Sequence, residues 1–343
     1  MQKSAFNIPL KHQRLYKTSR TRWFVRLIFR YKYILVAFAL FGIASASFVI
    51  AQSIPPADFA RGAIVRIPKD MTVSEAAVLL EQKGVIRSSF LYKAYMRVIR
   101  NGKGVQAGSY LFDQPQSAVR VAYRMAYGID ELQKIKVVIP EGSSSRNIAA
   151  IIKRAIPSFD AKSFLSEAQK YEGYLFPETY FFNPDVSPSE VISEMRTQFE
   201  EKVTALMGAI ATSTHALENV VVLASILEEE ANNTDDRRMI SGVLWNRINI
   251  GMPLQVDAPF YYLLGKTSSQ LTLSDLATTS PYNTYKNKGL PPAAISNPGL
   301  DAIRAALNPV PSKYLFYLAD QTGVTHYATT HDEHVENKWK FLR

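Results

Sequence analysis

Three consecutive glutamates, Glu228, Glu229 and Glu230, end an otherwise apolar run that begins at Val220. If this run is a helix, its apolar side chains share one face at 100° per residue. Glu228 and Glu230 then lie at opposite edges of that face, and Glu229 lies nearly opposite its centre. Desolvation at an apolar edge raises a carboxyl pKa towards the range that a general acid needs. Glu228 is therefore the best candidate of the three for a catalytic acid and base, although its position alone does not make it catalytic, and we expect Glu229 to face solvent.

Other interpretations of the acidic residues stay open. The spacing also fits an exposed helix end whose glutamates pair with Arg237 or Arg238. Glu178, in the aromatic segment 172–182, is a second candidate for the acid. If water is the nucleophile of the reaction, a second carboxylate is needed as its base, and Asp257 or Glu178 would serve.

Polar and aromatic side chains follow the glutamates on loop-like segments. A helix predicted over residues 235–250 ends at Gly251, which places Gln255 and Asp257 after a helical hairpin, within reach of Glu228. Loops of this composition suit a sugar groove, because rings stack on apolar sugar faces and amides bond hydroxyls, but they equally suit ordinary turns. The candidates for substrate binding are Gln255, Asp257, Tyr282, Asn283, Tyr285 and Glu178.

Two upstream segments, residues 65–80 and 138–152, echo each other. Each combines a short β-rich run, an Ile-Pro pair, a turn with Ser or Thr at capping positions, and an apolar helical pattern. Two copies predict small α+β modules, with chance similarity as the alternative. Further elements are predicted as a strand over residues 106–112 and helices over residues 89–100, 117–127, 159–170 and 187–207.

The basic residues are concentrated at the N-terminus. The chain of 343 residues has a formal charge of +10, but nine Lys and Arg precede Tyr33 without any acidic residue among them. The remaining 311 residues carry 31 basic and 30 acidic side chains. A basic tail followed by a nearly neutral body argues against a nucleic-acid-binding protein.

The segment from Tyr33 to Ala57 carries no charge and is long enough to cross most of a bilayer core of about 30 Å. Lys and Arg before it, with Asp58 as the first charge after it, predict a cytoplasmic N-terminus and an extracytoplasmic body. A cleaved signal peptide is the alternative, although 32 residues before the apolar stretch would be unusually many. We expect a single-pass membrane protein.

The chain has no cysteine, which excludes disulfides, thiolate metal sites and thiol nucleophiles. His326, His331 and His334 cluster near the C-terminus, but their spacing is a poor zinc pattern. We expect neither a metal nor another cofactor.

Several motifs occur together and in order along the chain. Each is weak alone, whereas the set is specific. They are the stretches Glu172–Tyr180 (EGYLFPETY), Leu223–Glu230 (LASILEEE), Val243–Arg247 (VLWNR), Gly251–Asp257 (GMPLQVD), Tyr282–Tyr285 (YNTY), Gly289–Pro292 (GLPP) and Ile295–Pro298 (ISNP). In these stretches the chain resembles the YceG-like family of endolytic murein transglycosylases. It departs from the family pattern at Glu229, Glu230 and Ala231, and after Asp257.

The resemblance implies an enzyme that cuts peptidoglycan between N-acetylmuramic acid and N-acetylglucosamine, with Glu228 at the position of the essential glutamate. The muramic 6-hydroxyl would replace water as the nucleophile and leave a 1,6-anhydro end. It also implies a LysM-like module, a location in the bacterial inner membrane and a partnership with peptidoglycan synthases. The alternatives are a hydrolase using Glu228 with Asp257, and a non-catalytic peptidoglycan-binding scaffold.

The expected fold is α+β: one transmembrane helix, small LysM-like modules, and a mainly helical catalytic domain with a groove built from loops. The boundaries are 1–33 for the tail, 34–52 for the membrane helix, 53–60 for a linker, 61–136 for the LysM-like module, 137–215 for a second module and 216–343 for the catalytic domain.

Overall fold

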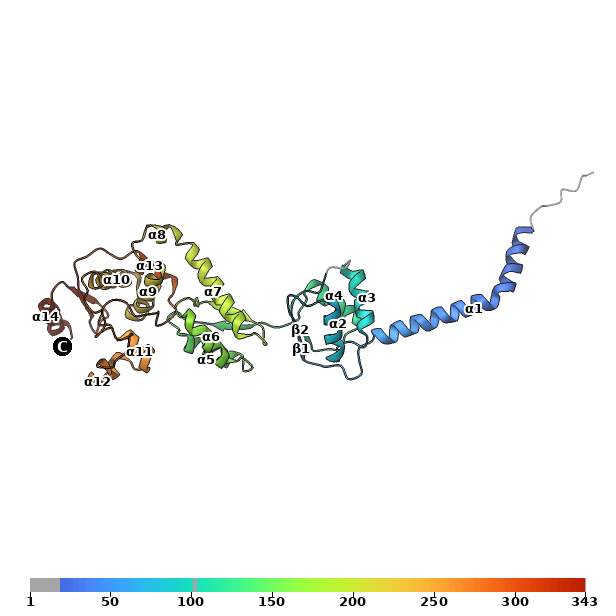
Figure 1. Ribbon diagram of the computed structural model, residues 1–343, viewed down its shortest axis with the longest axis horizontal. Coiled ribbons are helices and arrows are strands. Elements are labelled where there is room, and N and C mark those ends of the chain that lie inside the picture. The colour runs from blue at the N-terminus through green and yellow to red at the C-terminus, as the bar shows by residue number, and fades with distance from the viewer. Residues whose placement is uncertain (1–18, 101–103, 343) are drawn as a thin grey trace, which may run out of the picture. The chain divides into compact units, whose positions relative to one another are not determined.

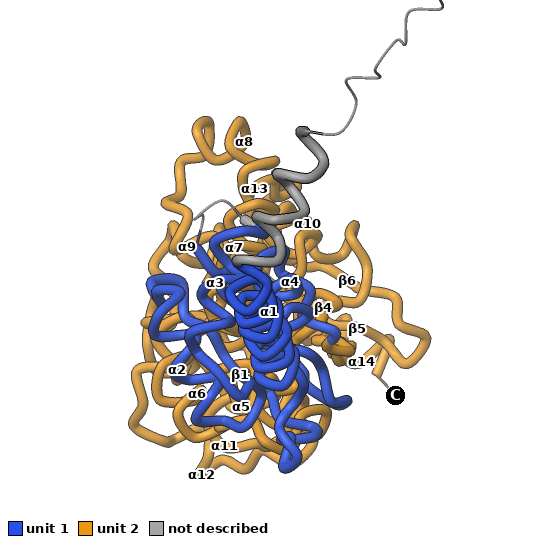
Figure 2. The backbone as a smooth tube through the Cα atoms, turned by 90° about the vertical axis from the view of Figure 1, so that its right-hand side faces the viewer, with its two compact units in different colours: residues 1–131 blue, residues 132–343 orange. Residues whose placement is uncertain are grey.

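The computed structural model describes residues 19–100 and 104–342. It divides into two compact units, residues 1–131 and 132–343 (Figures 1 and 2). The fold is mixed α+β and mostly helical, with two-stranded sheets.

The first unit begins with helix α1 (Ser19–Ser53). Its stretch Tyr31–Ser53 is long and apolar enough to cross a membrane, and it is exposed along almost its whole length. The predicted span, residues 34–52, lies within this stretch.

A small α+β module follows α1. Strands β1 (Ala63–Ile67) and β2 (Gly108–Phe112) pair antiparallel with Val65 opposite Tyr110. Three helices pack with this two-stranded sheet: α2 (Val73–Gln82), α3 (Ser89–Arg100) and α4 (Ala118–Tyr127). Their buried apolar faces form one core with the strands, which explains the helical periodicity seen in the sequence.

The second unit opens with another antiparallel pair of strands. Strands β3 (Ile135–Val138) and β4 (Thr179–Phe182) pair antiparallel, and α5 (Ser145–Ala155), α6 (Ala161–Ala168) and α7 (Pro188–Thr204) pack beside them. Both expected copies of the strand–turn–helix unit are therefore present, one as β1 with α2 and the other as β3 with α5. The two turns also end alike, because the hydroxyls of Thr72 and Ser144 are the N-caps of α2 and α5.

The remainder of the second unit is built around α9 (Leu217–Glu230), whose apolar residues from Val220 to Leu227 are nearly all fully buried. It packs against α10 (Thr234–Asn249) and α13 (Leu300–Leu307). The other elements are α8 (Met207–Thr212), α11 (Ala258–Leu264), η2 (Ser268–Gln270), α12 (Leu273–Leu276), β5 (Phe316–Ala319), β6 (Thr325–Ala328) and α14 (His331–Phe341), besides η1 (Gln169–Tyr171) after α6.

Candidate active site

Glu228 is held on both carboxylate oxygens. Arg237 of α10 donates to Oε1 at 2.5 Å, and the N–H of Gly299, the N-cap of α13, donates to Oε2 at 2.7 Å. Arg237 also pairs with Asp301 at 2.8 Å, and the Glu228 side chain is only 5% exposed. Burial raises the pKa of Glu228 above its usual value, against the lowering effects of the Gly299 N–H and Arg237. Glu228 thus joins the end of α9 to the starts of α10 and α13.

Glu230, the last residue of α9, has a different environment. Its Oε2 accepts one hydrogen bond, from the Tyr317 hydroxyl of β5 at 2.9 Å. Burial, with the negative charges of Asp257 and Glu229, raises the pKa of Glu230 to about 7, against the lowering effects of the Tyr317 hydrogen bond and Arg247. A carboxyl group of this pKa exchanges its proton near neutral pH, as a general acid and base requires.

A cavity of about 690 Å³ opens beside Glu230. Glu229, which is exposed as its place on the helix predicts, also lines it, whereas Glu228 does not. One wall comes from the β3–α5 turn and α5, the other from α9 and α11. The lining residues are Pro140, Glu141, Gly142, Ser143, Asn147, Ile151, Glu229, Glu230, Asp257, Ala258, Tyr261, Lys266, Thr267 and Ser268.

Gly142 brings the β3–α5 turn close to the glutamates. Its φ is +75°, and a Cβ at this position would lie 2.8 Å from Oε1 of Glu229. The turn is tied down because the Gly142 N–H donates to the Asn297 carbonyl at 3.0 Å, and the Asn297 N–H donates to the Ser143 carbonyl at 3.1 Å. Both the conformation and the approach favour glycine here.

A buried polar network holds this wall in place. The Asn297 side chain accepts from the N–H groups of Gly173 and Leu175, at 2.9 and 2.8 Å, and donates to Glu172 and to the Ser143 carbonyl, both at 2.9 Å. Glu172 also accepts the Ser145 N–H at the start of α5. These residues belong to the EGYLFPETY and ISNP stretches, for which the sequence alone indicates no structural role.

Three of the expected groove residues lie near Glu230. Asp257 lines the cavity and accepts a hydrogen bond from the Tyr285 hydroxyl at 2.6 Å. Gln255 is exposed, with φ at +49°, one of two described residues other than glycine with positive φ. Such backbone strain concentrates at functional sites. Gln255, Asp257 and Tyr285 all line a second cavity of about 420 Å³ that also reaches Glu230.

The other expected site residues lie elsewhere. Asn283 is fully buried and bonds the carbonyls of Leu276 and Thr278, so it stabilises its loop and is closed to a substrate. Tyr282 packs against Tyr262 with ring centroids 5.6 Å apart. Glu178 pairs with Lys202 at 2.9 Å, which holds its pKa below the usual value, the opposite of what an acid at neutral pH needs.

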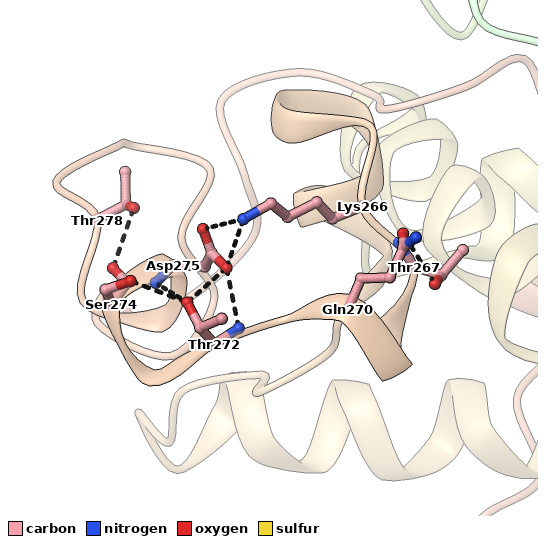
Figure 3. Close-up of polar contacts among 7 residues, drawn as sticks. All are labelled: Lys266, Thr267, Gln270, Thr272, Ser274, Asp275 and Thr278. Atoms are coloured by element: carbon pink, nitrogen blue, oxygen red, sulfur yellow. Dashed lines mark hydrogen bonds and ion pairs between the residues drawn. The ribbon is translucent and has the colours of Figure 1, made fainter.

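The segment after α11 forms a lip of the cavity that was not expected from the sequence. Figure 3 shows Lys266 reaching Asp275, at 2.7 Å, while Thr272 and Asp275 cap α12 reciprocally. Thr267 and Gln270 form a second capping box one turn earlier. The Thr-x-x-Asp and Thr-x-x-Gln spacings were the signal that could have revealed this lip.

Helix α14 was also missed, and it forms one wall of the second cavity with His331, His334 and Lys338. These three residues are spaced three and four residues apart, so their side chains share one face of the helix. His326, in contrast, pairs with Asp320 at 2.8 Å. Among the residues that the structure describes, no group of three or more His, Asp or Glu side chains is arranged to hold a metal ion.

Comparisons with known proteins extend over most of the chain. Residues 65–340 match the YceG-like family. The chain is 31% identical to the endolytic murein transglycosylase of Bacillus subtilis over 81% of this chain and 84% of that protein. It is 29% identical to the endolytic murein transglycosylase of Streptococcus pneumoniae over 80% of this chain and 57% of that protein. The crystal structure of a YceG-like protein from Listeria monocytogenes matches with a TM-score of 0.55 and 31% identity, over 81% of this chain and 99% of that one.

Proposed function

Because the chain belongs to the YceG-like family, we propose that it is an endolytic murein transglycosylase in which Glu230 is the general acid and base. The observation that carries the assignment is the position of Glu230, which faces both cavities with a pKa of about 7. Glu228, expected from the sequence to have this role, has both carboxylate oxygens bonded within the protein. It serves here to position the end of α9.

The reaction needs one carboxyl group. Protonated Glu230 donates its proton to the glycosidic oxygen as the bond from C1 of N-acetylmuramic acid breaks through an oxocarbenium-like state. The Glu230 carboxylate then accepts the proton of the muramic 6-hydroxyl as this oxygen attacks C1. The products are a 1,6-anhydromuramic end and a free N-acetylglucosamine hydroxyl, and Glu230 is protonated again.

The neighbours of Glu230 assist in both steps. Asp257 favours the protonated form of Glu230 by its charge and lies where it can stabilise a developing oxocarbenium ion. The Tyr317 hydroxyl favours the carboxylate that forms after proton transfer. Gln255 and Tyr285 line the second cavity and contact the strand beyond the cleaved bond.

The test is digestion of purified sacculi by the parent and by Glu228→Gln, Glu229→Gln and Glu230→Gln, with products identified by mass. We expect anhydro ends from the parent and from the exposed control Glu229→Gln, and none from Glu230→Gln. Glu228→Gln should unfold at a lower temperature but give the same products. Loss of cleavage in a folded Glu228→Gln, with activity kept in Glu230→Gln, would return the role to Glu228.

The product type separates the alternatives. Reducing ends would indicate a hydrolase that uses Asp257 as a base for water. Intact strands from the parent would indicate a peptidoglycan-binding scaffold. Neither result is expected, because Glu230 combines a raised pKa with an open cavity.

The proposed substrate also determines on which side of the membrane the two units must lie. We propose that α1 crosses the inner membrane with the basic tail in the cytoplasm and both units outside, where peptidoglycan lies. The module of residues 61–136 is proposed to be LysM-like and to hold glycan strands, and synthases of peptidoglycan are proposed as partners. Protease protection of each end in intact cells tests this topology.

A further inference from the structure

The end of α1 is fastened directly to α3. The hydroxyls of Ser53, the last residue of α1, and Tyr95 of α3 are 2.6 Å apart. Arg87, just before α3, donates to the carbonyl of Pro55 at 3.1 Å. Figure 1 shows α3 beside the end of α1, with β1 and β2 on the far side of this unit. No loose linker separates the apolar helix from the module.

This connection fixes the depth of α3 if α1 spans a bilayer. The apolar stretch Tyr31–Ser53 has 23 residues and is therefore about 35 Å long, slightly more than a hydrocarbon core of about 30 Å. Ser53 then lies at the level of the head groups, and so does Tyr95, a residue type typical of that level. Phe90 and Val98 are about 8 and 5 Å from Tyr95 along the axis of α3.

The outward face of α3 combines apolar and basic side chains. Phe90 is 73% exposed and Val98 is 83% exposed, and Ala94 lies exposed between them at four-residue spacing. Lys93 and Arg97 are exposed on the flank of this stripe. An apolar stripe flanked by cations is the pattern of a helix that lies in a membrane interface.

We propose that α3 docks on the surface of the bilayer that α1 spans, with Phe90 and Val98 among the lipid head groups and Lys93 and Arg97 against anionic phosphates. The occupant of this face is thus an anionic phospholipid surface. A glycan strand would use hydroxyl and amide partners more than this apolar stripe offers. The docking holds the first unit against the membrane and is independent of which glutamate is catalytic.

The absence of cysteine allows a direct test. Single cysteines introduced by Phe90→Cys and Val98→Cys are labelled with an environment-sensitive nitrobenzoxadiazole dye in the full chain, reconstituted in nanodiscs with anionic lipid. Ala46→Cys, within α1, is the inserted reference. Lys69→Cys, exposed in the turn after β1, is the control, because Figure 1 shows the strand β1 on the side of this unit away from α1. Quenching by lipids that carry a shallow nitroxide is measured for all four.

We expect the labels at positions 90 and 98 to be quenched at least about half as strongly as the label at 46, because interfacial helices sink roughly 5–10 Å into the head-group boundary. The label at 69 should be quenched as little as free dye. Equal quenching at 69, 90 and 98, or a label at 46 that is not quenched, would overturn the proposal. So would protection of 90 and 98 by soluble glycan fragments without lipid quenching.

The basic residues give a second measurement. Lys93→Glu with Arg97→Glu, added to Phe90→Cys, should lower quenching several-fold in anionic nanodiscs, towards the level seen in purely zwitterionic ones. Equal quenching in both lipids, unchanged by the two substitutions, would contradict the choice of anionic head groups.

Discussion

Replacing Asn297 by leucine, which has nearly the same shape, tests whether the buried network sustains the cavity wall. The substitution removes the one acceptor, Oδ1 of Asn297, that the Gly173 and Leu175 N–H groups share at a fully buried position. Leaving a buried donor without a partner costs about 1–3 kcal/mol. Two such donors give an expected loss of about 4 kcal/mol in the free energy of unfolding. Glu172 also loses one donor, which adds to the cost.

Urea unfolding of the full chain in detergent, followed by the fluorescence of the buried Trp245, measures this loss. Asn308→Leu is the matched control, because Asn308 is exposed and its side chain donates only to the Arg304 carbonyl in the same stretch. We expect a change within about 0.5 kcal/mol for the control. A loss below about 1 kcal/mol for Asn297→Leu would refute the reasoning, since it would mean that the two N–H groups find other partners.

Two further predictions concern the cavity. Cleavage should slow as the pH rises through about 7, where Glu230 loses the proton it donates. Tyr317→Phe removes a hydrogen bond that favours the Glu230 carboxylate, so the fall in the cleavage rate should move to higher pH. A fall that stays at the same pH would contradict the assignment of Glu230. Gly142→Ala and Gly62→Ala, both at φ +75°, should each cost about 1–2 kcal/mol in urea unfolding. Only Gly142→Ala, beside Glu229, should also slow cleavage, and equal cleavage by the two would argue against a close fit of the turn.

Local sequence patterns were sufficient to predict much of the fold. The helix predicted over residues 89–100 is α3, and the one over residues 235–250 is α10 within one residue. In both, the apolar period and the ending signals, such as Gly251 after α10, lie within a few residues of each other. The exposure of Glu229 followed from the same period.

The choice between Glu228 and Glu230 could not be made from the helix alone. Both lie at edges of the same apolar face, and their difference comes from partners far along the chain. Gly299 and Arg237 meet Glu228, whereas Tyr317 meets Glu230. Only tertiary structure brings these groups together.

The C-terminal region was expected to be helical with loops, and the structure adds the β5–β6 hairpin to it. Strands of four residues carry too little alternation to be recognised. Without the hairpin, the spacing of His331 and His334 does not indicate that this face of α14 forms a wall of the second cavity.

The two strand–turn–helix copies differ at several turn positions, and one of these differences lies at the cavity. Asp70 stands in the first copy where Gly142 stands in the second, two residues before the equivalent caps Thr72 and Ser144. The first turn is free to vary as any surface turn is, while the second is fixed by the carboxylates it must approach. We therefore expect relatives to vary at position 70 and to keep glycine at position 142.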